Sequence, residues 1–98
     1  MGLFPDNNFN VEWRIHALQQ MITRNISRRD VLNIIHSGEI IESYSHDLPY
    51  PSFLIMGSSQ ERPLHIVVAH AEEINTVYGI TAYESDILKW DERFQRRK

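Results

Sequence analysis

The chain has 98 residues, of which 42% are hydrophobic and 23% are charged, and its formal net charge is −3. This length and composition indicate one folded domain over residues 1–98, with flexible ends at about 1–8 and 93–98. The lack of cysteine excludes disulfides, thiolate metal sites and a cysteine nucleophile.

Two short helices are predicted at the start of the domain. In the first, the apolar residues of 11–22 recur every three or four positions, so that they share one face. Asn10 is expected to cap this helix, and Asn25 to end it in the left-handed conformation. The second helix is predicted to open with a Ser-x-x-Asp capping box at residues 27–30 and to end at Gly38, which suits a C-terminal cap.

Four strands are predicted after the helices, at residues 39–45, 53–56, 64–69 and 77–83. The third is apolar on both faces, which is typical of a strand in the middle of a sheet. Short links between consecutive strands favour an antiparallel meander. The sequence therefore predicts an α+β fold, with two N-terminal helices followed by a four-stranded antiparallel sheet on which the C-terminal segment packs.

The ordered motifs of the chain resemble a known family. They are HALQQMITRNIS, HSGEIIESY, DLPYPSFLIMG, ERPLHIVVAH and ITAY, followed by Trp90 and by Arg96-Arg97. In order and spacing they are similar to the bacterial family called domain of unknown function 4258. The layout of that family is similar to the RelE/ParE and BrnT-like toxins, which are small α+β ribonuclease-type domains. The resemblance implies a toxin-like, metal-independent endoribonuclease, with RNA as substrate and an antitoxin-like protein or a second copy as partner.

Three residues at the ends of the last two strands are candidates for this chemistry. Metal-free RNA cleavage needs groups that accept and donate a proton and a cation near the phosphate. His65 is assigned the proton transfer, Arg62 the phosphate, and Tyr83 an assisting role or stacking on a base. Arg24 or Tyr44 is expected to complete substrate binding. The alternative is structural: a hydrogen-bonded core histidine, a cation paired with a carboxylate, and a sheet tyrosine with its hydroxyl in water.

No metal, cofactor or membrane partner is expected. His65 and His70 are five residues apart on one strand, so that their side chains point to opposite faces, and the other histidines lack a chelating spacing. The scattered glycines form no phosphate-binding loop. No apolar run approaches the roughly 20 residues that cross a bilayer, and the first residues lack a signal-peptide pattern, so a cytoplasmic protein is expected.

Protein interaction is the alternative function, and whether the protein is an enzyme is left open. The predicted edge strand at 39–45 suits a partner that adds a strand to the sheet. Tyr44, Tyr50 and Phe53 surround a proline-rich loop and suit the same role. Such a non-catalytic domain would bind a partner protein or a second copy of itself.

Overall fold

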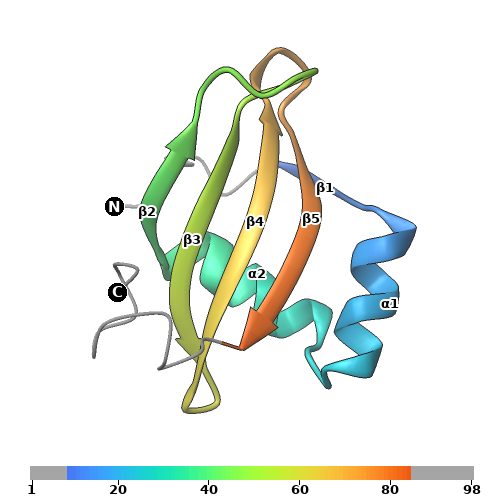
Figure 1. Cartoon of the computed structure of the whole chain (residues 1–98), viewed down its shortest axis with the longest axis vertical. Coiled ribbons are helices and arrows are strands. Elements are labelled where there is room, and N and C mark those ends of the chain that lie inside the picture. Colours follow the sequence, from blue (N-terminus) through green and yellow to red (C-terminus); the bar gives the residue numbers. More distant parts are fainter. Residues whose placement is uncertain (1–8, 85–98) are drawn as a thin grey trace.

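The computed structural model describes residues 9–84, which form two helices and one five-stranded sheet (Figure 1). The helices are α1 (Ile15–Thr23) and α2 (Arg28–Ser37), and a short 3-10 helix, η1, covers Glu72–Ile74. The strands are β1 (Asn10–Trp13), β2 (Glu39–Tyr44), β3 (Ser52–Ser59), β4 (Arg62–Ala71) and β5 (Thr76–Glu84). The sheet order is β1-β5-β4-β3-β2, which places the strand that is apolar on both faces in the middle.

The predicted arrangement of the sheet was wrong, although the α+β class fits. The first element is the strand β1, not a helix, and β1 pairs with β5 in parallel, so the sheet is mixed and has five strands rather than four antiparallel ones. The other neighbouring strands are antiparallel, as predicted. The likeness to the toxin layout rested on helices preceding a four-stranded sheet, and it therefore loses its basis.

The error arose because a short strand was assigned to a longer helix. Val11 and Trp13 are half-buried, whereas Glu12 between them is exposed, which is the alternation of a strand. Four residues are too few for this period to stand out from the helical pattern that follows. The predicted cap at Asn10 was wrong for the same reason: α1 starts after Arg14, with no capping hydrogen bond from a side chain.

The predicted junction between the helices was correct in detail. Asn25 has a φ of 56°, which is the left-handed conformation that ends α1. Ser27 and Asp30 form the predicted capping box, with each side chain 3.0 Å from the backbone nitrogen of the other residue. Gly38 follows α2 as predicted, but its φ of −76° is not left-handed. A glycine fits there because a Cβ atom would lie 2.5 Å from the carbonyl oxygen of Ile34.

Both helices contribute to a core on one face of the sheet. In the view of Figure 1, α2 lies behind the sheet and α1 lies beside β5. Burial of each large aliphatic side chain in such a core contributes roughly 1.5–3 kcal/mol. The buried members are Met21, Ile26, Val31, Ile34, Ile35, Ile55, Leu64, Ile66, Val68, Val77 and Ala82.

The opposite face of the sheet, which we call the front face, carries a different set of side chains. Paired residues on neighbouring strands point to the same side. His65 pairs with Tyr83, and Ala69 pairs with Tyr78. A β-bulge between these pairs adds one residue to β5, so Tyr78 and Thr81 both point to the front face although they are an odd number of residues apart.

Within residues 9–84, no helix is long and apolar enough to span a membrane. The predicted packing of the C-terminal segment on the sheet, and the predicted flexible ends, fall outside the described residues.

Candidate functional site

Arg62 lies on the helix-covered face, at the start of β4. Its Nη1 donates a hydrogen bond to the carbonyl oxygen of Asn25 at 2.6 Å, and its Nη2 donates to that of Arg24 at 3.1 Å. The same Nη2 forms an ion pair with Glu84 at 2.9 Å. These contacts tie the turn between the two helices to the end of β5, which is a structural role for the guanidinium.

His65 and Tyr83 lie together on the front face. Their ring centroids are 5.4 Å apart and the rings are tilted by 45°. The structure therefore brings two of the three predicted catalytic residues together, but it places Arg62 on the other side of the sheet. His65 has 0% of its surface exposed, so a phosphodiester in solvent does not reach its imidazole in this conformation. The catalytic roles assigned to these residues remain predictions.

The two residues predicted to bind substrate lie far apart in the sheet order. Tyr44 is at the end of the edge strand β2, where its hydroxyl donates to Glu42 at 2.7 Å. Arg24 follows α1, and its Nη1 donates to the carbonyl oxygen of Ala82 at 2.7 Å. Arg24 therefore lies against β5, which β4 and β3 separate from the strand of Tyr44.

Arg24 belongs to a polar row that joins α1 to β5. His16, Gln20 and Arg24 are spaced four residues apart, so they follow one another along one side of α1. The amide nitrogen of Gln20 is 3.0 Å from Nε2 of His16, and its amide oxygen is 3.5 Å from Nη1 of Arg24. The same oxygen accepts a hydrogen bond from the Thr81 hydroxyl. We call His16, Gln20, Arg24 and Thr81 the α1–β5 row.

A cation and two aromatic rings lie next to this row. The guanidinium of Arg14 is 5.4 Å from the ring centroid of Tyr78, a cation–π geometry. The Tyr78 ring is stacked on Tyr50, with centroids 5.7 Å apart and an interplanar angle of 6°. We call Arg14, Tyr78 and Tyr50 the tyrosine stack. Tyr78 and Thr81 are separated by roughly 10 Å along β5, and both point to its front face, so the stack and this member of the row lie on the same side of the strand.

The chemistry of this surface is that of a site for a polyanion with planar groups. Arg14 and Arg24 supply positive charge, and the tyrosines supply ring faces. His16 is exposed on α1 and adds an imidazole to this surface. Among residues 9–84, no group of three histidine or carboxylate side chains is arranged to hold a metal ion.

Most of this surface was missed from the sequence, although one signal was present. The residues of the row on α1 repeat every four positions within the motif HALQQMITR, and this spacing predicts a common helix face. Arg14 and Tyr78 gave no such signal, because their contact depends on the parallel pairing of β1 with β5.

These features define an α+β domain in which two helices cover a mixed sheet, with arginine and tyrosine side chains gathered along α1 and β5. The chain belongs to the family described as domain of unknown function DUF4258, whose model matches residues 13–84. This is the family that the sequence motifs indicated. Comparison with curated proteins and with solved structures finds no match.

Proposed function

We propose that the protein binds single-stranded RNA on the surface formed by the tyrosine stack and the α1–β5 row, and that it cleaves RNA there without a metal ion. The observation that carries this proposal is the clustering of two arginines, an exposed histidine and a stacked tyrosine pair on one surface. The proposal rests on these side chains and not on the fold, since many functions share one architecture.

The tyrosine stack supports binding of unpaired bases. Stacking of a base on an aromatic side chain contributes roughly 1–3 kcal/mol and tolerates any base, because every base has a π-face. Arg14 holds its charge next to the Tyr78 ring, where it would attract the phosphate of a base stacked on the tyrosines. The chain carries a net charge of −3, so an RNA site needs a local cluster of cations of this kind.

The α1–β5 row supports cleavage. In metal-free RNA cleavage the 2′-oxygen attacks the adjacent phosphorus and the 5′-oxygen leaves, which gives a 2′,3′-cyclic phosphate and a 5′-hydroxyl. His16 takes the proton of the 2′-hydroxyl at Nε2, where Gln20 now donates, and an imidazolium or water protonates the leaving oxygen. Arg24 binds the phosphorane, because its hydrogen bonds to Gln20 and Ala82 within residues 9–84 both use Nη1 and leave its other nitrogens as donors there.

Proton transfer is assigned to His16 rather than to His65 because of exposure. His16 is exposed on α1, whereas His65 has no exposed surface. Tyr83, also predicted as catalytic, has its ring against that of the buried His65.

The test combines binding and cleavage of a 12-nucleotide unstructured RNA in a buffer that contains EDTA. Replacing Arg14 and Tyr78 by alanine is expected to weaken binding at least tenfold, as measured by fluorescence anisotropy. The matched control is R28A with R29A, which removes two exposed cations from α2 and is expected to change affinity less than twofold. Equal weakening by both pairs would contradict the assigned surface.

Cleavage is tested separately with H16N, which is expected to bind RNA like the wild type and to lose cleavage. H46N, a change at an exposed histidine in the loop before β3, is the control and is expected to cleave normally. Cleavage by H16N at the wild-type rate would refute the assigned proton transfer and leave the binding proposal standing.

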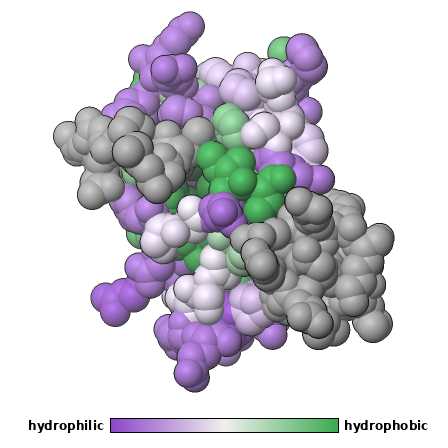
Figure 2. All heavy atoms as spheres, turned by 90° about the vertical axis from the view of Figure 1, so that its left-hand side faces the viewer, coloured by the Kyte–Doolittle hydropathy of each residue, from purple (hydrophilic) through white to green (hydrophobic). Residues whose placement is uncertain are grey.

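A second candidate is association through the edge strand β2, and one observation favours it. Figure 2, which faces the β2 side of the molecule, shows hydrophobic residues gathered at the middle of this side. Ile40 and Ile41 of β2 are half-buried, and among strands of residues 9–84 β2 pairs with β3 alone. A β-bulge at this point of β2 works against strand addition.

Light scattering on the purified chain tests this second candidate. Association predicts a mass well above the 11.6 kDa of one chain, and a return to that mass for I41K. A wild-type chain that stays at the monomer mass at 0.1 mM would exclude self-association through β2.

A further inference from the structure

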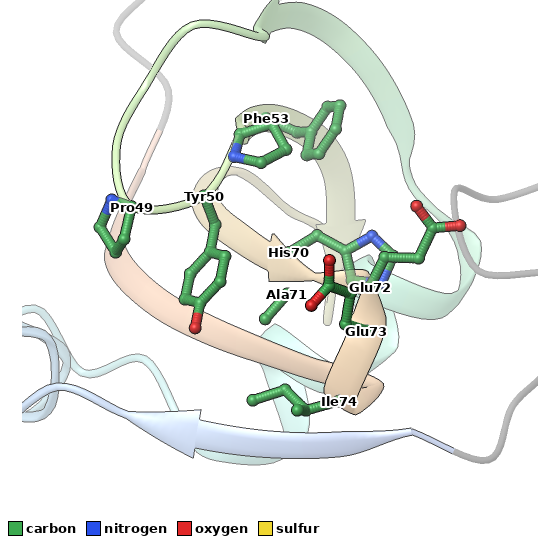
Figure 3. A pocket seen from close by; sticks show the side chains of 9 residues that line it. Pro49, Tyr50, Phe53, His70, Ala71, Glu72, Glu73 and Ile74 are labelled. Atoms are coloured by element: carbon green, nitrogen blue, oxygen red, sulfur yellow. The ribbon is translucent and has the colours of Figure 1, made fainter.

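A pocket of about 560 Å³ lies at the end of the sheet near η1, away from the α1–β5 row. One wall is the loop before β3, with Pro49, Tyr50 and Pro51, and the other wall is the end of β4 with η1. In Figure 3 Pro49 and Tyr50 lie on one side of the hollow, and His70 lies on the other. Because the backbone nitrogen of His70 donates to the carbonyl oxygen of Pro51 at 3.0 Å, the two walls are joined at the base.

The charged groups that line the pocket within residues 9–84 are acidic. Glu72 and Glu73 lie on η1 and are exposed, and no lysine or arginine of that part of the chain lines the pocket. Burial lowers the pKa of His70 below its ordinary value of 6.5, and the carboxylate of Glu72 opposes this shift. The imidazole is therefore neutral near pH 7, and the pocket carries a net negative charge.

The uncharged part of the lining is aromatic and apolar. Tyr50 and Phe53 offer ring surface, and Ile74, which also lines the pocket, is 54% exposed. A cation that leaves water for such a wall is attracted by the negative faces of the aromatic rings. A carboxylate at the mouth accepts charge-assisted hydrogen bonds, and an arginine donates two of them side by side.

We propose that this pocket binds an arginine side chain of a partner protein, together with the apolar residue next to it. The charge selects a cation, and the volume exceeds what one side chain fills, so a neighbouring residue of the same peptide enters with it. Arginine suits the pocket better than lysine because its flat guanidinium stacks on Tyr50 and pairs with a carboxylate at once. RNA is the wrong ligand for this pocket, since its phosphates would face Glu72 and Glu73. The inference does not depend on RNA binding elsewhere.

The test uses the full chain, labelled with ¹⁵N, and the peptide acetyl-Ala-Leu-Arg-Ala-amide. NMR titration is expected to shift the amide signals of the pocket, at Tyr50, His70 and Glu72 to Asn75. The same peptide with citrulline in place of arginine keeps the shape and removes the charge, and it is expected to bind at least tenfold more weakly.

Variants of the protein distinguish the effect of the pocket carboxylates from that of negative charge elsewhere on the chain. The double variant E72Q with E73Q is expected to lower the affinity for the arginine peptide at least tenfold, because it removes both carboxylates of the pocket. E61Q, at the exposed turn between β3 and β4, is the control and is expected to change affinity less than twofold.

Three results would overturn the inference. The first is that the arginine peptide shifts no amide signal, and the second is that the citrulline peptide binds as tightly as the arginine peptide. The third is that E61Q loses as much affinity for the arginine peptide as the double variant does. Saturation of the same signals by spermine at the same concentration would show a site for free amines instead of a partner protein. Tighter RNA binding by the double variant without any response to the arginine peptide would show that the glutamates act only by repelling RNA.

Discussion

Asp30 links three segments through one carboxylate. Its Oδ2 accepts from the backbone nitrogen of Ser27 at 3.0 Å, and its Oδ1 accepts from the hydroxyl of Ser59 at 2.6 Å. The side-chain hydrogen bond from Ser59 and the backbone hydrogen bond from Ser27 hold the pKa of Asp30 below its ordinary value of 3.8, against the opposing effect of burial. The charged carboxylate therefore stabilises both the start of α2 and the end of β3.

Replacing Asp30 by alanine is expected to lower the free energy of unfolding by about 1–3 kcal/mol at pH 7, because Ser59 is buried and loses its acceptor. Urea unfolding measures this change, with E61A at an exposed turn as the control. The pKa is lower in the folded state than in the unfolded state, so the contribution is present above pH 3.8 and is lost as the pH falls through the folded value. A difference between wild type and variant that does not shrink at all as the pH falls below 3.8 would contradict this origin.

Gly38 and Gly57 both pack closely against neighbouring atoms, and they differ in whether the nearest of those atoms belongs to the backbone or to a side chain. A Cβ atom at Gly38 would lie 2.5 Å from the carbonyl oxygen of Ile34 and 2.8 Å from that of Met56, whereas one at Gly57 would lie 3.0 Å from the Cγ1 of Ile34. Backbone oxygens cannot move aside as a side-chain carbon can. We expect G38A to lower the free energy of unfolding by about 1–3 kcal/mol. G57A should cost less in the same thermal or urea experiment, and the reverse order would refute this explanation.

Residues whose role depends on near neighbours were predictable from the sequence. The left-handed Asn25 and the capping box of Ser27 with Asp30 are set within a few residues, and both were correct. The partner of Arg62 was not predictable, because Glu84 lies 22 residues away along the chain. Its placement depends on how the strands pair.

Among the elements, β1 decides the architecture. It joins the edge of the sheet next to β5 and leads directly into α1 (Figure 1). Trp13 pairs with Gly79, where a Cβ atom would lie 3.0 Å from the Cε3 of the indole ring. The glycine thus makes room for the ring, and the ring packs against the core.

The strand assignment of β1 predicts opposite effects at neighbouring positions. W13A is expected to lower the free energy of unfolding by about 2–4 kcal/mol, since it removes a large side chain packed on the core. E12A, which points to the other side, is expected to change it by less than about 0.5 kcal/mol. If residues 11–22 formed one helix, Trp13 would lie off its apolar face and W13A would be the mild change.

The candidate surface shows why elements that are predicted correctly do not by themselves give a site. β5 was predicted at nearly its true bounds, but the bulge that turns both Tyr78 and Thr81 to the front face is one extra residue with no mark in the sequence. Arg14 reaches Tyr78 only because β1 is a strand. The sequence contains these residues, but it does not predict that they lie close together in the fold.

At the scale of the whole molecule, charge is distributed unevenly. The acidic pocket near η1 and the basic side chains around α1 lie on different parts of the domain, and Tyr50 belongs to both the pocket and the tyrosine stack. A net charge of −3 therefore coexists with a surface suited to RNA. The family was identified from ordered motifs, whereas the toxin-like layout was not supported, since that comparison relied on an order of elements that the chain does not have.

The salt dependence of RNA binding reports how many cations take part. Each phosphate contact on a single strand adds roughly 0.7 to the slope of log affinity against log salt. We expect R14A to reduce the measured slope by about 0.7, while R28A leaves it unchanged. Anisotropy titrations between 50 and 300 mM salt at roughly five concentrations suffice to separate these outcomes. A slope that R14A does not alter would mean that Arg14 contacts no phosphate.

The most direct measurement of the central claim is NMR titration of the ¹⁵N-labelled chain with a short single-stranded RNA. The account predicts that the largest shifts fall on the amides of Arg14, Gln20, Tyr78 and Thr81, around α1 and β5. Shifts confined to the edge strand β2, or no shift at any position in low salt, would contradict it.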